Sequence, residues 1–270
     1  MVTTLGKISI VFITGFILLA LLSAVFSNND VYDPITGFDM NIISVSSPSV
    51  KHPLGTDFWG RDIFSQICSG AYHAFLDGLG WSIVGIPVLV GAAYVMAQLR
   101  EKQPRKETFF MQYMKFGVFP LCVTCVLFIL NLRTVSLIGL LFMTRSITLF
   151  FAPVIALLGW FAVGHELEAQ FRKKERISNR LLLSGAMLIF SYAPLYDGMI
   201  ALAGIGDPTT MTWGTMIELY FSVEYTFTAP FWLISPIVCI YVFSRCMLAA
   251  SYWLYNYGPR ERYFIREGWV

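Results

Sequence analysis

The chain has 270 residues, of which 56% are hydrophobic and only 13% are charged. Soluble domains carry charge on about 25% of their residues, so this composition excludes a soluble globular protein and predicts a polytopic membrane protein. The net charge of +2 is too small to indicate a nucleic-acid partner. Because a bilayer offers no water to satisfy backbone groups, we expect an all-α fold.

Six apolar segments are each long enough to cross a hydrocarbon core of about 30 Å. They span roughly residues 7–27, 72–99, 108–130, 135–163, 181–205 and 231–257. The longer polar stretches between them are 28–70, 165–180 and 207–230, and the last contains an amphipathic run over 213–221. The sequence therefore predicts one transmembrane domain over 1–270, with six membrane helices.

The basic residues are distributed unevenly over this topology. Thirteen Lys and Arg residues fall on one side of the membrane and three on the other. The thirteen lie at Lys7 and in the stretches 100–107, 165–180 and 258–270. Cytoplasmic loops carry the excess of Lys and Arg, so both termini and the 165–180 connection are predicted to be cytoplasmic. The 28–70 and 207–230 loops should then lie outside, in a multi-pass protein of the plasma (inner) membrane.

The run from His52 to Ser65 lies between two apolar segments and is rich in turn-forming and charged residues. Gly55 and Gly60 permit tight backbone turns. Asp57, Arg61 and Asp62 can pair with one another or with the backbone at a helix start. On physical grounds alone, an ordinary capped loop leading into the next helix explains these residues.

The same run also resembles a family signature. It reads His52-Pro53-Leu54-Gly55-Thr56-Asp57, then Gly60-Arg61-Asp62, then Ser65 and Gly70-Ala71. This pattern is similar to the one before the second membrane helix in the permease subunits of dipeptide/oligopeptide/nickel-type ABC importers. A second match follows near the C-terminus, with Gly204-x-Gly206, Pro208, Trp213-Gly214-x-Met216 and Ala229-Pro230-x-Trp232.

The resemblance implies a permease-like fold that carries peptides or a similar small polar solute across the membrane. It also implies a second permease subunit, two ATPase subunits and an extracellular substrate-binding protein as partners. ATP hydrolysis would then belong to the partner subunits, and no cofactor is expected. The outer-loop signature residues are His52, Pro53, Gly55, Asp57, Gly60, Arg61 and Asp62.

The cytoplasmic connection departs from the family pattern. In the family this connection carries Glu-Ala-Ala and a later Gly, and it transmits ATPase closure to the permease. Here only Glu168-Ala169 matches, no Gly follows at the expected place, and basic residues come next: Arg172, Lys173 and Lys174. The alternative is a permease-derived structural subunit of another membrane complex that has lost transport coupling. The many aromatic residues would suit contacts with membrane lipids and neighbouring subunits.

Two charged residues inside apolar segments are candidates for buried roles, Arg145 and Asp197. Charges at membrane depth are costly and usually paired, so we expect an ion pair between the fourth and fifth segments. The pair can be structural, or it can line a pathway for a polar solute.

Catalytic and metal patterns are missing from the sequence. His165-Glu166 does not continue as His-Glu-x-x-His, and neither a Gly-x-Ser-x-Gly elbow nor a P-loop lysine occurs. Cys122 and Cys125 lie within an apolar segment, where packing explains them better than redox or metal chemistry. We therefore expect neither an enzyme nor a metal site.

Overall fold

The computed structural model describes residues 2–102 except 28 and 43, residues 163–223 except 203, 205, 206 and 208, and residues 230–256. Within these ranges the chain is helical and has no strand, apart from one isolated bridge between Thr56 and Asp62. The helices are α1 (Val2–Phe26), α2 (Ile63–Lys102), α7 (Gly164–Lys173), α8 (Asn179–Leu202), α9 (Trp213–Ser222) and α10 (Pro230–Asn256).

Four of the described helices, α1, α2, α8 and α10, are long and apolar enough to cross a membrane. They correspond to four of the six predicted segments, so the all-helical class and the multi-pass membrane character are confirmed. The predicted segments 108–130 and 135–163 lie outside the described residues, apart from Val163. The predicted amphipathic run is the short helix α9.

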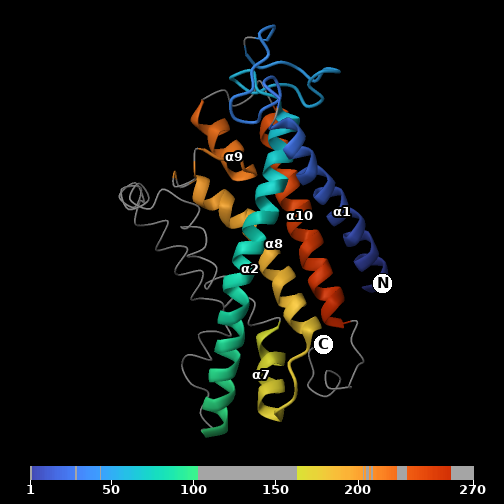
Figure 1. Cartoon of the computed structure of the whole chain (residues 1–270), viewed down its shortest axis with the longest axis vertical. Helices are drawn as coiled ribbons and strands as arrows, with labels where there is room; N and C mark the ends of the chain where they lie inside the picture. The colour runs from blue at the N-terminus through green and yellow to red at the C-terminus, as the bar shows by residue number, and fades with distance from the viewer. Residues whose placement is uncertain are drawn as a thin grey trace.

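The four long helices form a bundle in which α1 packs against α2 and α10, and α8 packs against the same two helices. Residues 27–62, here named the capping loop, gather with α9 at one end of the bundle (Figure 1). At the other end lies α7, toward which the start of α1 and the end of α10 also point (Figure 1). The two predicted outer regions therefore share one end, and the 165–180 connection lies at the opposite end.

Small residues let the long helices approach closely, as is usual in membranes. The Ser184 hydroxyl on α8 donates to the Ser251 carbonyl on α10 at 2.9 Å, and the Ser251 hydroxyl donates back to the Ser184 carbonyl at 2.8 Å. Between α2 and α8, a Cβ at Gly78 would lie 2.4 Å from the ring of Phe190. These contacts set which faces of α8 meet its two neighbours.

The start of α2 differs from the prediction. The second segment was expected from about residue 72, but α2 begins at Ile63, so the loop before it ends at Asp62 rather than at 70. The Ser65 N–H donates to the Asp62 carboxylate at 2.7 Å, which is a helix N-cap. The polar residues Ser65, Gln66 and Ser69 therefore lie on the first turns of a helix, where they are buried.

Candidate functional site

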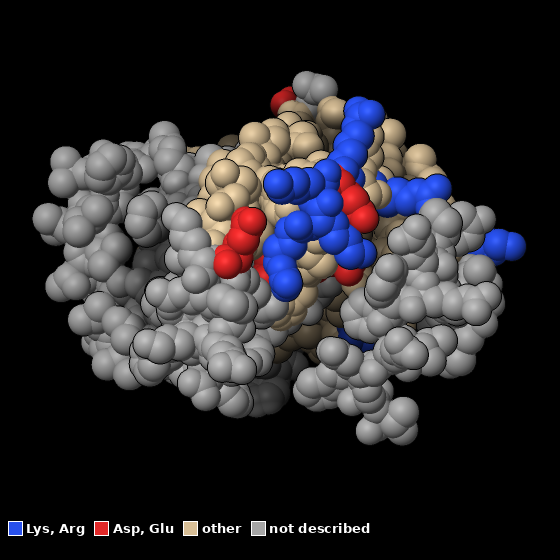
Figure 2. Space-filling model, turned by 90° about the horizontal axis from the view of Figure 1, so that it is seen from below, with Lys and Arg blue, Asp and Glu red and all other residues tan. Residues whose placement is uncertain are grey.

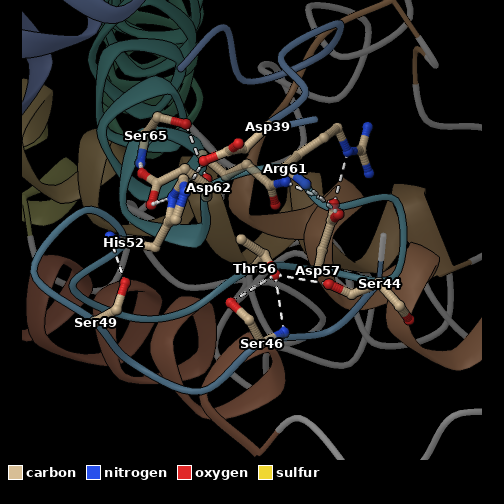
Figure 3. A network of polar contacts seen from close by, with 11 residues as sticks. Asp39, Ser44, Ser46, Ser49, His52, Thr56, Asp57, Arg61, Asp62 and Ser65 are labelled. Carbon is tan, nitrogen blue, oxygen red and sulfur yellow. Dashed lines mark hydrogen bonds and ion pairs between the residues drawn. The ribbon is translucent and has the colours of Figure 1, made fainter. Parts of the chain in front are cut away.

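A network of polar side chains joins the capping loop to the first turns of α2 (Figure 3), and many of these side chains are buried. The fully buried members, each at most 1% exposed, are His52, Thr56, Asp57, Asp62, Ser65 and Gln66. A buried polar group is costly unless it is hydrogen-bonded. Each buried side chain named here makes at least one hydrogen bond, although Gln66 Oε1 and Arg61 Nη2 make none.

His52 links the Asp39 carboxylate of the capping loop with the Asp62 carboxylate at the start of α2. Its Nδ1 lies 3.0 Å from Asp62 Oδ1, and its Nε2 lies 3.5 Å from Asp39 Oδ2. Burial raises the pKa of Asp62, against the Ser65 N–H and His52, which both lower it. The Asn41 N–H and the His52 side chain lower the pKa of Asp39. The imidazole thus holds the 39–41 turn against the first turn of α2.

Asp57 is the second centre of the network. Its Oδ2 accepts from Arg61 Nε at 2.6 Å and from Gln66 Nε2 at 2.7 Å. Its Oδ1 accepts from the N–H groups of Trp59 and Arg61, both at 2.9 Å. The Arg61 guanidinium also lies 4.6 Å from the centroid of the Trp59 ring. Asp57 therefore closes its own turn and ties it to α2 through Gln66.

Thr56 and the two signature glycines fold the rest of the loop. The Thr56 hydroxyl donates to the Ser44 carbonyl at 3.0 Å and accepts from the Ser46 N–H at 2.9 Å. Gly55 and Gly60 have backbone φ angles of 82° and 78°. Residues that carry a side chain rarely adopt this region of φ. A Cβ at Gly55 would also lie 2.3 Å from the Ser46 carbonyl oxygen. The backbone path therefore requires both glycines. Pro53, two residues before Gly55, is exposed.

The second matching stretch packs directly against the first. Trp213 Nε1 on α9 donates to the Ile67 carbonyl on α2 at 3.1 Å. The Ser69 hydroxyl donates to the Met211 carbonyl at 2.9 Å. A Cβ at Gly70 would lie only 2.1 Å from Trp213 Cδ1, so Gly70 is what lets the indole reach α2.

Further out, the rings of Trp59 and Trp232 meet edge to face, with their centroids 6.1 Å apart. The described parts of both stretches that resemble the permease family therefore build one structural unit at this end of the bundle, while Gly206, Pro208 and Ala229 lie outside the described residues.

Comparison with known proteins finds no family model that matches this chain and no curated protein that is significantly similar to it. The family assignment therefore stays a prediction that rests on these residues.

The contacts of the network are suited to holding the fold at this end of the bundle. Its carboxylates and its imidazole are buried: His52 contacts Asp62 and Asp39, and Asp57 accepts from Arg61 and Gln66. Within the described ranges, no group of three His, Cys, Asp or Glu side chains is placed to hold a metal ion. The arrangement can cap α2, hold the capping loop rigid and seat α9.

The other predicted site residues lie elsewhere. Asp197 is on α8 beside α9, where a Cβ at Gly214 would lie 2.8 Å from its Oδ2. Arg145 lies outside the described residues, so the Arg145–Asp197 pair stays a prediction. On α7, Glu168 is only 2% exposed and its Oε2 lies 3.9 Å from His165 Nδ1.

The rest of the predicted coupling segment faces outward to different degrees. Ala169 is half-buried, whereas Arg172, Lys173 and Lys174 are exposed. The two residues that match the family motif, Glu168 and Ala169, are thus buried or half-buried, whereas the basic residues that follow are exposed to solvent.

Several network members were not singled out from the sequence, namely Asp39, Ser46 and Gln66. Gln66 lies one turn after Asp62, so a helix start at Ile63 would have placed it near Asp57. Asp39 and Ser46 have no comparable signal, because their contacts are made by the loop closing on itself.

Proposed function

We propose that this chain is a membrane-spanning permease subunit of an ABC-type importer for peptides or a similar small polar solute. The observation that carries the proposal is the contact between the two matching stretches. Trp213 of one stretch donates to Ile67, beside Gly70 of the other, across 146 residues of chain. The two stretches that resemble the family are distant in the sequence and lie in contact in the structure, and this supports the proposal.

In this proposal the capping loop and α9 lie outside, toward an extracellular substrate-binding protein. The α7 end lies in the cytoplasm, next to two ATPase subunits, and both termini are cytoplasmic. Exposed Lys and Arg side chains gather at the α7 end, as Figure 2 shows, and the positive-inside rule supports this orientation. The protein would be an inner-membrane subunit paired with a second permease.

A solute pathway would run along α8. Asp77 on α2 and Asp197 on α8 both lie within helices that are long and apolar enough to cross a membrane. Ionisable side chains within membrane spans usually mark a pathway or a buried pair. We place the polar solute's pathway on the Asp197 side of α8, next to α9.

A second candidate function is favoured by the position of α7. Figure 1 shows α7 beside the lower part of α2, and its Leu167 and Glu168 are buried. A coupling lever should instead present its motif to the ATPase. This supports the alternative, a permease-derived structural subunit of another membrane complex that has lost coupling to an ATPase.

Purification of the full chain from native membranes separates the two functions. A photo-crosslinking residue at Arg172 on α7 and a control at Lys51 in the capping loop are compared by mass spectrometry. An ATPase captured at Arg172, together with a second permease, supports the importer. Unrelated enzyme subunits co-isolating, with no ATPase at Arg172, would favour the structural role and overturn the first proposal.

A further inference from the structure

The segment from Arg172 to Arg180 is a compact cationic surface. Five of its nine residues are basic and one, Glu175, is acidic. The basic side chains are all exposed: Arg172, Lys173, Lys174, Arg176 and Arg180. Seen from the α7 end, blue side chains cluster near the middle of the described surface (Figure 2). We name these nine residues the basic segment.

The backbone of the basic segment is held in one conformation. The Lys174 N–H donates to the Phe171 carbonyl at 3.1 Å, and the Glu175 N–H donates to the Gln170 carbonyl at 3.0 Å. The Gln170 side-chain oxygen then accepts from the Ser178 N–H at 3.2 Å. Gln170 thus joins the end of α7 to the start of α8, so the cations are presented on an ordered turn.

Apolar side chains at both ends of this turn face the bundle. The centroids of the Phe171 ring and of the Tyr94 ring on α2 are 5.5 Å apart. Ile177 packs against the hydrophobic core that contains Trp81, Leu89 and Leu188. With these side chains inward, the charged side chains between them are directed away from the protein.

Lys174 has an unusual backbone conformation for a residue that carries a side chain. It has φ of 57° and is the one non-glycine residue with positive φ among those the structure describes. Helices commonly end in this conformation with Gly, which adopts it without steric cost. A lysine here places a cation at a point where the backbone alone would favour glycine.

The basic segment directly adjoins a helix that is long and apolar enough to cross a membrane. Arg180 is in the first turn of α8, and α8 (Asn179–Leu202) is one of the four membrane-crossing helices. A cation at the end of an apolar span lies at the level of lipid phosphates, and long basic side chains reach that level readily. Clusters of four to eight Lys and Arg directly beside a span are typical binding sites for anionic lipids.

We propose that the basic segment binds the headgroups of anionic phospholipids in the leaflet at the α7 end. The phosphate of one or more lipids is held by Arg176 and Arg180, with Lys174 on the adjoining turn. A lipid is favoured over an acidic protein because Arg180 belongs to the span itself. The proposal requires only that α8 crosses the membrane, so it does not depend on the importer function.

The test uses the full chain in mild detergent with added phosphatidylglycerol or phosphatidylcholine, and native mass spectrometry counts bound lipid. We expect retained phosphatidylglycerol to exceed phosphatidylcholine, and the preference to weaken with salt. The double substitution R176Q/R180Q should lower the preference by on the order of tenfold. K51Q, which removes an exposed cation at the opposite end, is the matched control and should change nothing.

A third variant separates lipid binding from folding. K174G relieves the backbone strain, so it should keep or raise the thermal unfolding midpoint while lowering phosphatidylglycerol retention. Equal retention of both lipids would overturn the proposal, as would unchanged preference in R176Q/R180Q. Inorganic phosphate competing as well as the lipid would show a free-anion site instead.

Discussion

His52 Nδ1 lies 3.0 Å from Asp62 Oδ1, while the other oxygen of the same carboxylate caps α2 by accepting the Ser65 N–H at 2.7 Å. The buried Asp62 carboxylate therefore binds a side chain of the capping loop and also caps the start of α2. The imidazole is 0% exposed, and its other nitrogen faces Asp39. The first turn of a membrane-spanning helix is thus tied to the fold of the loop before it.

Replacing His52 with Ala should destabilise this end of the protein. The variant would leave two carboxylates near a cavity, with the buried Asp62 lacking its side-chain partner. We expect a loss of about 3 kcal/mol in the free energy of unfolding. Thermal unfolding in detergent measures it, and K51A, an exposed neighbour, is the control. Equal midpoints for H52A and K51A would contradict a supporting role for the imidazole.

Asp57→Asn tests the charged acceptor at the second centre. An amide has only one acceptor oxygen, so its NH₂ group would face either two backbone donors or the side-chain donors Arg61 Nε and Gln66 Nε2. We expect a loss of about 2 kcal/mol. D30N changes an exposed loop carboxylate in the same way and should unfold like the wild type. A D57N protein as stable as D30N would show that the ion pair adds nothing.

The contact between α2 and α9 predicts a clear difference between two glycines of the same helix. A Cβ at Gly70 would overlap the Trp213 ring at 2.1 Å, whereas a Cβ at Gly91 meets nothing within 4 Å. G70A should therefore destabilise the protein by about 1–3 kcal/mol. G91A should be neutral, or stabilising by about 1 kcal/mol, because alanine favours the helix.

Unfolding midpoints of both variants in the same detergent measure this difference. If G70A were as stable as G91A, α9 would not be seated on α2 as described.

Asp33 predicts a dependence of stability on pH. Burial raises its pKa, but the N–H groups of Thr36 and Ile35 and the Thr36 hydroxyl together lower it below the ordinary value of 3.8. A carboxyl with a lowered folded-state pKa adds stability above the unfolded-state pKa and loses it as the pH falls through the folded value. D33N should thus differ most from the wild type near neutral pH, and the two should converge in acid.

Thermal unfolding at several pH values from about 2 to 7 measures that convergence. The substitution T36V removes one of the donors to Asp33, so it should reduce the acid dependence without abolishing it. A D33N profile parallel to the wild type over the whole range would argue against any contribution of this carboxylate.

The amino-acid sequence by itself determined the membrane class, the helical fold and the approximate positions of α1, α8, α9 and α10. These follow from local properties, because hydropathy over about 20 residues sets a span and needs no knowledge of neighbours. The start of α2 was placed too late for the same reason. The residues from Ser65 to Gly70 are polar or small apart from Ile67, and hydropathy alone does not place them in a membrane helix, where they lie buried against α9.

The tertiary structure alone decided which side chains meet. Asp39 reaches His52 because the capping loop folds back on itself, and Trp213 reaches Ile67 across 146 residues of chain. Neither contact has a local pattern, since a side chain's partner depends on how distant elements pack. The inward position of Glu168 was also settled in this way, because α7 buries one face against α2, and a motif in the sequence does not say which face that is.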